Sequence, residues 1–368
     1  MNVVIAAGGT GGHVFPALSL ADVLVRDHGA HVRFIGSPDG QEATHIPAAG
    51  YRFDAVKAAP FVREVSMRAA KAPVIAVRSV FECASLVRGA DVAVGTGGYV
   101  SLAPMLAARR AHVPIVLHEP NAIPGLANRL LARSATSVAI AFEDARSRIP
   151  GGARIEMIGY PVRTTILDVP THRAALAEEA RSLLGLELER RTVMVTGGSQ
   201  GALHLDQVVA AALPLFAERG DLQLLIVTGP GREFELAGAA ERAGAARVVV
   251  VPFLDRMELG YAAADLVVAR SGATTISELA VCGLPSILVP YPHATEDHQD
   301  ANARELVRVG AAVLVPDVEL TPDVFATTLL ALVDDAGMLA SMAERASGWA
   351  KPDAADRFAS LVVEAVRT

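Results

Sequence analysis

The stretch VIAAGGTGG at residues 4–12 has a counterpart, VMVTGGSQG, at residues 193–201. In both copies a short apolar run ends in a glycine-rich turn, and a helical pattern follows the turn. Glycine lets the backbone come close to a ligand, and the exposed N–H groups at the start of a helix attract anions. The repeat therefore predicts two similar α/β halves, each with an anion-binding turn after its first strand.

Strands and helices are expected to alternate along most of the chain. Short apolar runs predict strands at 3–7, 32–35, 92–94, 115–117, 138–140, 192–196, 222–228, 248–251, 266–269 and 286–289. Helical patterns separate these runs, which is typical of parallel sheets in α/β proteins. We expect two doubly wound domains, 1–162 and 163–352, with the helical segment 353–368 packed back on the first. Such sheets bind ligands at the carboxyl ends of their strands, so we expect the site in a cleft between the domains.

Composition excludes several classes of protein. Hydrophobic residues make up 52% of the chain and charged residues 20%, which excludes a disordered protein. Cys83 and Cys282 lie far apart and outside any zinc-site spacing, so we expect both to be buried. No secretory signal and no apolar run of membrane-spanning length is expected. Residues 1–160 carry 16 Lys and Arg against 12 Asp and Glu, a positive charge too modest for nucleic acid as the main partner.

Two glycine-rich turns in the first half predict a site for a diphosphate. GGTGGH at 8–13 and GTGGYVS at 95–101 each follow a strand and precede a helical pattern. A dinucleotide-binding GxGxxG motif is excluded because Val14 stands where its third glycine belongs, and a Walker A loop because no lysine follows a glycine. HEPN at 118–121 follows a further strand and adds an ionisable pair to the same end of the sheet.

The second half offers two interpretations of its first turn. GGSQG at 197–201 matches the GxSxG turn of serine hydrolases, in which Ser199 is the nucleophile. The counterpart of Ser199 in the first half is Thr10, so a phosphate-binding role accounts for both turns, and a hydrolase stays the alternative. RSGATTISE at 270–278 begins another helix whose first N–H groups favour a phosphate. A polar loop at 293–302 follows the last predicted strand and suits sugar hydroxyls.

Together these motifs resemble the MurG family of bacterial peptidoglycan glycosyltransferases over nearly the whole chain. The stretches that carry the resemblance are 8–16 (GGTGGHVFP), 95–101 (GTGGYVS), 118–121 (HEPN), 161–164 (PVRT), 197–202 (GGSQGA), 270–278 (RSGATTISE) and 297–302 (DHQDAN). The resemblance implies the GT-B fold of two Rossmann-like domains. It also implies inverting transfer of N-acetylglucosamine (GlcNAc) from UDP-GlcNAc to the 4-hydroxyl of N-acetylmuramic acid (MurNAc) in the undecaprenyl-diphosphate-linked pentapeptide, lipid I. The product, lipid II, serves cell-wall biogenesis, and with it cell shape and division.

The resemblance also implies a set of site residues. Those expected to bind the donor are Thr10, Gly11, Gly12, Asn121, Arg163, Ser199, Leu254 for the uracil, Gly272, Ala273, Thr274, Thr275, Ile276 and Ser277 for the diphosphate, Glu278 for the ribose and Gln299 for the GlcNAc. No metal ion and no cofactor is expected. His13 is the first candidate for the general base, because the ordinary histidine pKa of ~6.5 suits proton transfer at neutral pH. Glu119 is the second, and hydrogen bonding from a neutral His13 to a phosphate is the competing role.

The chain departs from the family pattern at Pro120, Asp206 and His298, where the family usually has Gln, Asn and Gln. The segment 61–87 mixes arginines and a lysine with apolar residues, so we expect it to rest on the anionic inner leaflet of the cell membrane, which makes the protein peripheral to its cytoplasmic face. A core-facing helix with solvated arginines is the alternative for this segment. Alternatives for the whole chain are another GT-B protein, such as a UDP-sugar 2-epimerase or a glycolipid glycosyltransferase, and a serine hydrolase that uses Ser199.

Overall fold

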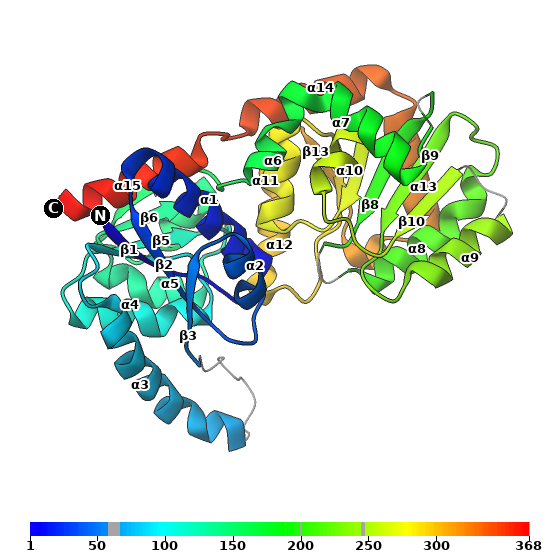
Figure 1. The fold of residues 1–368 in the computed structure, drawn as a ribbon. Coiled ribbons are helices and arrows are strands. Elements are labelled where there is room, and N and C mark those ends of the chain that lie inside the picture. The colour runs from blue at the N-terminus through cyan, green and yellow to red at the C-terminus, as the bar shows by residue number, and fades with distance from the viewer. Residues whose placement is uncertain (58–66, 188, 199–200, 244–246, 368) are drawn as a thin grey trace. The chain divides into compact units, whose positions relative to one another are not determined.

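The computed structural model describes residues 1–57, 67–187, 189–198, 201–243 and 247–367, and for residues 67–76 the backbone alone. The chain divides into two compact units. Unit 1 comprises Met1–Arg163 and Lys351–Thr368, and unit 2 comprises Thr164–Ala350. Each unit is a parallel sheet covered by helices (Figure 1).

The sheet of unit 1 has the strand order β3-β2-β1-β4-β5-β6-β7. Every neighbouring pair runs parallel. Its strands are β1 (Asn2–Ala6), β2 (His31–Gly36), β3 (Arg52–Ala55), β4 (Val92–Gly95), β5 (Ile115–Glu119), β6 (Ser137–Ile140) and β7 (Arg154–Met157). The central strands β1 and β4 are buried on both faces, which explains their apolar runs, and β5 is apolar until it ends in His118 and Glu119.

Helices cover both faces of this sheet. They are α1 (Gly11–His28), α2 (Glu42–Ala48), α3 (Met67–Val87), α4 (Leu102–Arg110), α5 (Leu126–Leu131) and α15 (Ala354–Arg367), with 3₁₀ turns η1 (Tyr99–Ser101), η2 (Ala132–Ser134) and η3 (Glu143–Arg148). Side chains alternate along β1, so Val3 and Ile5 pack on α1 and α15, while Val4 packs on the opposite face with the buried Cys83 of α3. The C-terminal helix α15 is therefore part of the core of unit 1.

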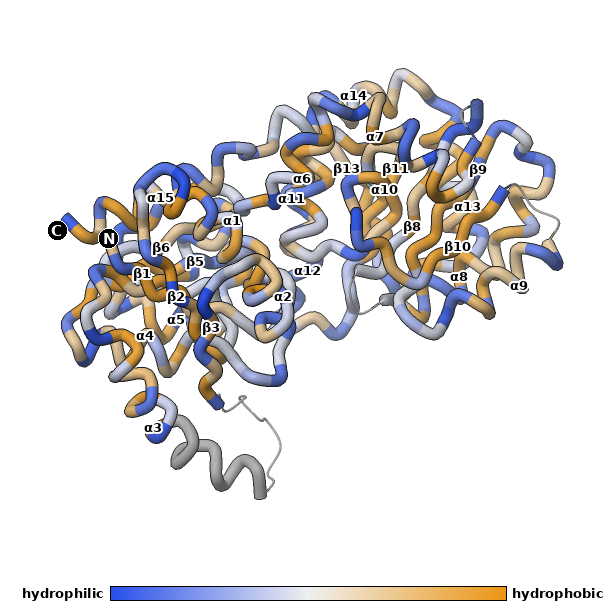
Figure 2. Tube along the Cα trace, viewed as in Figure 1, coloured by the Kyte–Doolittle hydropathy of each residue, from blue (hydrophilic) through white to orange (hydrophobic). Residues whose placement is uncertain are grey.

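The sheet of unit 2 has the order β10-β9-β8-β11-β12-β13, again with every pair parallel. Its strands are β8 (Arg191–Thr196), β9 (Leu222–Val227), β10 (Arg247–Val251), β11 (Leu266–Ala269), β12 (Ser286–Leu288) and β13 (Ala312–Leu314). Figure 2 shows β8 and β9, near the middle of this sheet, in the hydrophobic colours. The predicted fold class, α/β with two doubly wound parallel sheets, is confirmed.

The helices of unit 2 also lie on two faces. They are α6 (Thr164–Leu167), α7 (Val169–Leu184), α8 (Leu203–Ala212), α9 (Glu233–Ala243), α10 (Met257–Ala263), α11 (Ala273–Val281), α12 (His298–Arg308), α13 (Pro322–Val333) and α14 (Ala336–Trp349), with 3₁₀ turns η4 (Leu213–Phe216), η5 (Thr295–Asp297) and η6 (Asp317–Glu319). Val193 and Val195 of β8 share a core with α8 and α13, whereas Met194 points to Gly260 of α10.

The chain order of each sheet reverses beside its first strand. In unit 1, β1 lies between β2 and β4, and in unit 2, β8 lies between β9 and β11. The turns that follow β1 and β4 are therefore neighbours, as are those that follow β8 and β11. Sheets of this kind bind ligands at this switch point, outside the carboxyl ends of the strands. Four of the predicted motifs begin at these two places.

Within the described residues, no single helix has the length and hydropathy of a membrane span. One helix pair, Pro322–Val333 with Ala336–Arg367, reaches that length and composition together, and it is bent by 89°.

Candidate active site

His13 is joined to the turn after β4 by two hydrogen bonds. Its Nδ1 lies 2.8 Å from the carbonyl oxygen of Thr96, and the Thr96 hydroxyl donates to the carbonyl of His13 over 2.8 Å. A carbonyl oxygen can only accept, so Nδ1 must carry the proton. In the neutral ring the lone pair is therefore on Nε2. This tautomer suits a base, because Nε2 is the atom that can take up a proton.

Two glycines leave room for the His13 ring. A Cβ at Gly97 would lie 2.8 Å from Cε1 and 2.9 Å from Nδ1 of His13, and one at Gly98 would lie 3.4 Å from its Cδ2. Both glycines have positive φ, +100° at Gly97 and +73° at Gly98. The imidazole of His13, from the first glycine-rich motif, thus packs directly on the backbone of Gly97 and Gly98 in the second motif.

Glu42, which no sequence motif marked, organises the first turn. Its carboxylate is fully buried and accepts hydrogen bonds from the N–H of Gly9, at 3.1 Å, and of Ser37, at 2.9 Å. A Cβ at Gly8 or Gly40 would overlap this carboxylate. Glu42 therefore ties the turn after β1 to the end of β2, and the N–H of Gly9 is directed at a carboxylate.

Glu119, at the end of β5, is buried and closely hydrogen-bonded. Its oxygens accept from the N–H of Asn121 (3.0 Å), the N–H of Gly125 (3.0 Å) and the side-chain amide of Asn128 (2.8 Å). Burial raises the pKa of Glu119 to about 7, although these donors favour the charged form. Asn121, a predicted donor-binding residue, is thus held at the start of a loop that Glu119 organises. Of the two predicted bases, Glu119 therefore has both carboxylate oxygens engaged in hydrogen bonds that hold the loop after β5.

His118, the first residue of HEPN, lies in the core of unit 1. It is fully buried, and its ring centroid lies 5.9 Å from that of Tyr160 and 5.2 Å from that of Phe358 in α15. Burial, together with the charge of His13, lowers the pKa of His118 to about 3. The Tyr160 hydroxyl donates to the carbonyl of Gly12 over 3.0 Å. The packed rings of His118, Tyr160 and Phe358 therefore stabilise the start of α1 through the hydrogen bond from Tyr160 to Gly12.

Arg163 lies in unit 1 rather than at the sheet edge of unit 2. Its guanidinium carbon stands 4.7 Å from the centre of the Phe15 ring on α1. Since Phe15 is two residues after His13, Arg163 lies over the same helix as the candidate base. Thr10 is exposed and is the N-cap of α1, with no side-chain capping bond, and Gly11 and Gly12 form the first turn of that helix. The predicted residues Thr10, Gly11, Gly12, His13 and Arg163 thus meet at one helix end.

In unit 2, the helix α11 begins directly at the carboxyl end of β11. Its N-cap is Gly272, which has no side chain to accept the first N–H groups of the helix, and no acidic residue lies in the first turn. The start of such a helix carries partial positive charge and binds anions. Thr274 and Thr275 are partly exposed here, whereas Ala273, Ile276 and Ser277 are buried. The backbone of this turn, more than its side chains, can therefore hold a phosphate.

Glu278 and Leu254 are less accessible than their predicted roles suggest. Glu278 is 3% exposed, and its Oε2 accepts from the Tyr261 hydroxyl of α10 over 3.0 Å. Leu254 is 8% exposed and packs on Gly260, where a Cβ would lie 2.8 Å from its Cδ2. Tyr261 and Gly260 are neighbours, so α10 positions both predicted nucleoside contacts.

Gln299 is held beside the turn before α11. Its side-chain oxygen accepts from the N–H of Tyr291 at 2.9 Å, and its backbone carbonyl accepts from the Ser271 hydroxyl at 2.8 Å. An amide whose oxygen is fixed in this way presents its NH₂ as a donor. Arg270, just before Ser271, is buried, donates to the carbonyls of Val289 and Pro290, and forms an ion pair with Asp317.

Ser199, predicted as a phosphate ligand or as a nucleophile, lies outside the described residues. The same holds for Gln200. The described ends of that turn, Gly198 and Gly201, both have positive φ, +76° and +66°. Thr196 accepts from the N–H of Gly198 through its hydroxyl at 3.2 Å.

Comparison with known proteins identifies the family. Residues 3–140 match the glycosyltransferase family 28 N-terminal domain, and residues 192–358 match the glycosyltransferase family 28 C-terminal domain. A UDP-N-acetylglucosamine–N-acetylmuramyl-(pentapeptide) pyrophosphoryl-undecaprenol N-acetylglucosamine transferase from Acidothermus cellulolyticus is 43% identical, over 99% of this chain and 98% of the relative. The protein of the same name from Halothermothrix orenii is 37% identical over 100% of both chains.

Solved structures agree with the sequence relatives. The crystal structure of Acinetobacter baumannii MurG has a TM-score of 0.79 and 28% identity, over 99% of both chains. A UDP-GlcNAc 2-epimerase from Neisseria meningitidis has a TM-score of 0.72 at 11% identity, over 100% of both chains, which is a likeness of fold alone. With sequence relatives that match along its full length, the chain belongs to the MurG family of glycosyltransferases.

Proposed function

We propose that this protein transfers GlcNAc from UDP-GlcNAc to the 4-hydroxyl of MurNAc in lipid I, with inversion at the anomeric carbon. Membership of the MurG family supports the substrates. The observation that carries the mechanism is the hydrogen bond from Nδ1 of His13 to Thr96, because it leaves the basic lone pair on Nε2. We therefore assign the general base to His13 and a positioning role to Glu119.

In the proposed reaction the acceptor oxygen O4 attacks the anomeric carbon of GlcNAc. A bond forms between O4 and this carbon, and the bond from the carbon to the β-phosphate oxygen breaks, so UDP leaves with the electron pair. Nε2 of His13 takes the hydroxyl proton as the new bond forms. A positioned base typically contributes about 10²–10⁴-fold to the rate.

The leaving diphosphate gains negative charge in this step, and we place it at the start of α11. The N-cap Gly272 has no side chain that could cap the first N–H groups of that helix, and these groups point out of the helix start, toward the place proposed for the ligand. Such preorganised donors stabilise developing charge without moving during the reaction. The family resemblance implies that Arg163 also binds the donor, with a positive charge that suits a diphosphate.

A lipid-linked acceptor requires access to a membrane surface, and unit 1 supports such a contact. On α3, Val77 and Phe81 are 58% and 63% exposed, and Arg78 is exposed between them. The guanidinium carbon of Arg110, on α4, lies 5.9 Å from the centre of the Phe81 ring. Arg68 and Lys71 lie where only the backbone is described. Arg78 forms an ion pair with Glu82 across 2.7 Å on the same helix. We propose that the apolar surface of Val77 and Phe81, with the arginines beside it, rests on anionic lipid.

A transfer assay tests the proposed function. The purified protein is incubated with radiolabelled UDP-GlcNAc and a short-chain lipid I analogue, and a labelled disaccharide product is expected. UDP-GlcNAc without acceptor controls for epimerase activity, and a fluorophosphonate probe controls for a serine nucleophile. Conversion of UDP-GlcNAc in the absence of acceptor, or labelling of Ser199 by the probe, contradicts the proposal.

A further inference from the structure

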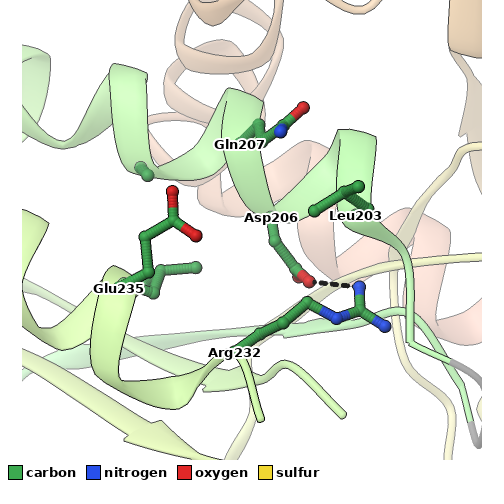
Figure 3. A pocket seen from close by; sticks show the side chains of 7 residues that line it. Leu203, Asp206, Gln207, Arg232 and Glu235 are labelled. Carbon is green, nitrogen blue, oxygen red and sulfur yellow. Dashed lines mark hydrogen bonds and ion pairs between the residues drawn. The ribbon is translucent and has the colours of Figure 1, made fainter. Parts of the chain in front are cut away.

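Asp206 is a buried carboxylate in the first turn of α8, in unit 2. It is 5% exposed, and its Oδ2 lies 2.9 Å from an Nη atom of Arg232, which precedes α9 (Figure 3). Burial raises the pKa of Asp206 to about 6, and the charges of Arg232 and Arg270 oppose this rise. The pair lines a pocket between α8 and α9 together with Leu203, Gln207, Ala210, Glu235 and Leu236.

The guanidinium of Arg232 also packs on the backbone that follows β8. A Cβ at Gly201 would overlap Arg232 and the carbonyl oxygen of Thr228. A Cβ at Gly229 would lie 3.2 Å from the Cα of Gly201, so the two backbones touch. Both glycines have positive φ, +66° and +89°. Arg232 therefore rests on the last residue of the glycine turn, and Asp206 holds it there.

Stability alone gives little reason for this arrangement. A buried ion pair contributes little net free energy, because removing two charges from water offsets their attraction. The ion pair instead fixes an orientation, because a planar guanidinium that is held by a carboxylate occupies one position over Gly201.

We propose that Arg232 is a positioning residue for the donor diphosphate. It fixes Gly201, the described end of the turn that follows β8, at the switch point between β8 and β11 where the leaving diphosphate is placed. This inference rests on the proposed function. It assigns no contact between Arg232 and the substrate, so its effect acts through the turn.

Four variants and a control test the inference in the full-length protein. UDP binding is measured by isothermal titration calorimetry, and kcat and KM are measured in the transfer assay. For Arg232→Ala we expect the Kd for UDP and the KM for UDP-GlcNAc to rise about 10-fold to 100-fold, as for a misplaced binding group. The KM for the acceptor is expected to stay unchanged. Arg232→Lys is expected to recover only part of the lost UDP affinity. The control is Arg242→Ala, which changes an exposed arginine of α9 and is expected to keep the wild-type Kd and KM.

The double variant separates positioning from mere charge balance. Asp206→Asn removes the buried charge, so Asp206→Asn with Arg232→Ala leaves no unpaired carboxylate. Because Asp206 holds Arg232 in place, Asp206→Asn alone is also expected to raise the Kd, and wild type is the reference. If Arg232 only neutralises Asp206, the double variant binds UDP as wild type does, and the inference is overturned. If Arg232 positions the turn, the double variant keeps the raised Kd. Wild-type protein that fails to bind UDP contradicts the proposed function itself, whereas equal binding by wild type and Arg232→Ala contradicts only this inference.

Discussion

Nδ1 of His13 donates to the carbonyl oxygen of Thr96 across 2.8 Å, and Thr96 returns a hydrogen bond to the carbonyl of His13. These residues lie 83 positions apart and belong to different glycine-rich motifs. Because β1 and β4 are neighbours, the two motifs meet at the switch point of the sheet. The contact fixes both the orientation and the tautomer of the ring, which a catalytic base requires.

Replacement of His13 tests its role as the base. In His13→Ala we expect kcat to fall by about 10²–10⁴-fold, because no group takes the hydroxyl proton. The KM for UDP-GlcNAc should change little, and this separates the base from a phosphate ligand, whose loss would raise that KM. His28→Ala, at the exposed end of the same helix, is the control and should keep wild-type kcat. Steady-state transfer kinetics measure all three proteins.

Gly97→Ala tests whether space for the His13 ring is needed. The new Cβ would lie 2.8 Å from Cε1 of His13 at a φ of +100°, so the ring must move. We expect kcat to fall at least tenfold and stability to fall by about 1–3 kcal/mol. Gly89→Ala is a matched control, since Gly89 also has positive φ, +79°, and no atom within 4 Å of its Cβ position. If both variants keep wild-type kcat, the packing of the ring does not matter.

The sequence predicted the inner strands of both sheets better than their edges. The ten predicted strands include the central β1, β4, β8 and β11, which are buried on both sides. Among them there is no β3, β7 or β13, and these three lie at sheet edges. The fourth edge strand, β10, was predicted at 248–251, because its sequence is an apolar run. Edge strands are half exposed, so β3 carries Arg52 and Asp54, and β7 carries Arg154 and Glu156. Without an apolar run, such a strand gives no signal of its own.

The residues of the candidate site also fall into two groups, those that the sequence predicted and those that it did not. Turn and helix-start motifs predicted His13 and the Gly272 turn, because these features are local in sequence. Glu42 and Arg232 were not predicted, since their partners are brought to them only by the fold: Gly9 lies 33 positions from Glu42, and Asp206 lies 26 positions from Arg232. Glu42 carries one earlier signal, the glycines at 36 and 40 that leave room for its side chain.

The proposed membrane surface predicts a separation of binding from chemistry. In Val77→Ser with Phe81→Ser we expect weaker binding to vesicles that contain anionic phospholipid, because two exposed apolar side chains of α3 are lost. Transfer to a water-soluble acceptor analogue should keep wild-type kcat. Phe234→Ser removes a phenylalanine that is 82% exposed in unit 2, and serves as the control. Flotation of the double variant with vesicles at the wild-type level would refute the surface.

Glu119 predicts how stability depends on pH. Its pKa is raised from an ordinary value of 4.5 to about 7, so between these values the folded protein holds a proton that the unfolded chain has released. The contribution of Glu119 to the free energy of unfolding must therefore fall as pH rises through this window, by about 3 kcal/mol in all. In Glu119→Gln this dependence is absent. The amide also faces the N–H groups of Asn121 and Gly125 with only one acceptor, which costs about 1–3 kcal/mol at every pH.

Urea unfolding followed by circular dichroism, at a series of pH values from about 5 to about 7, measures the difference between the two proteins. We expect wild type to be the more stable at the acidic end, and its advantage to shrink as pH rises, because only wild type loses the bound proton. Glu143→Gln, an exposed glutamate of the same unit, should follow the wild-type slope across this range. Parallel curves for wild type and Glu119→Gln would mean that Glu119 is ionised throughout. It would then be a carboxylate at neutral pH, and the assignment of the general base to His13 would have to rest on the kinetics of His13→Ala.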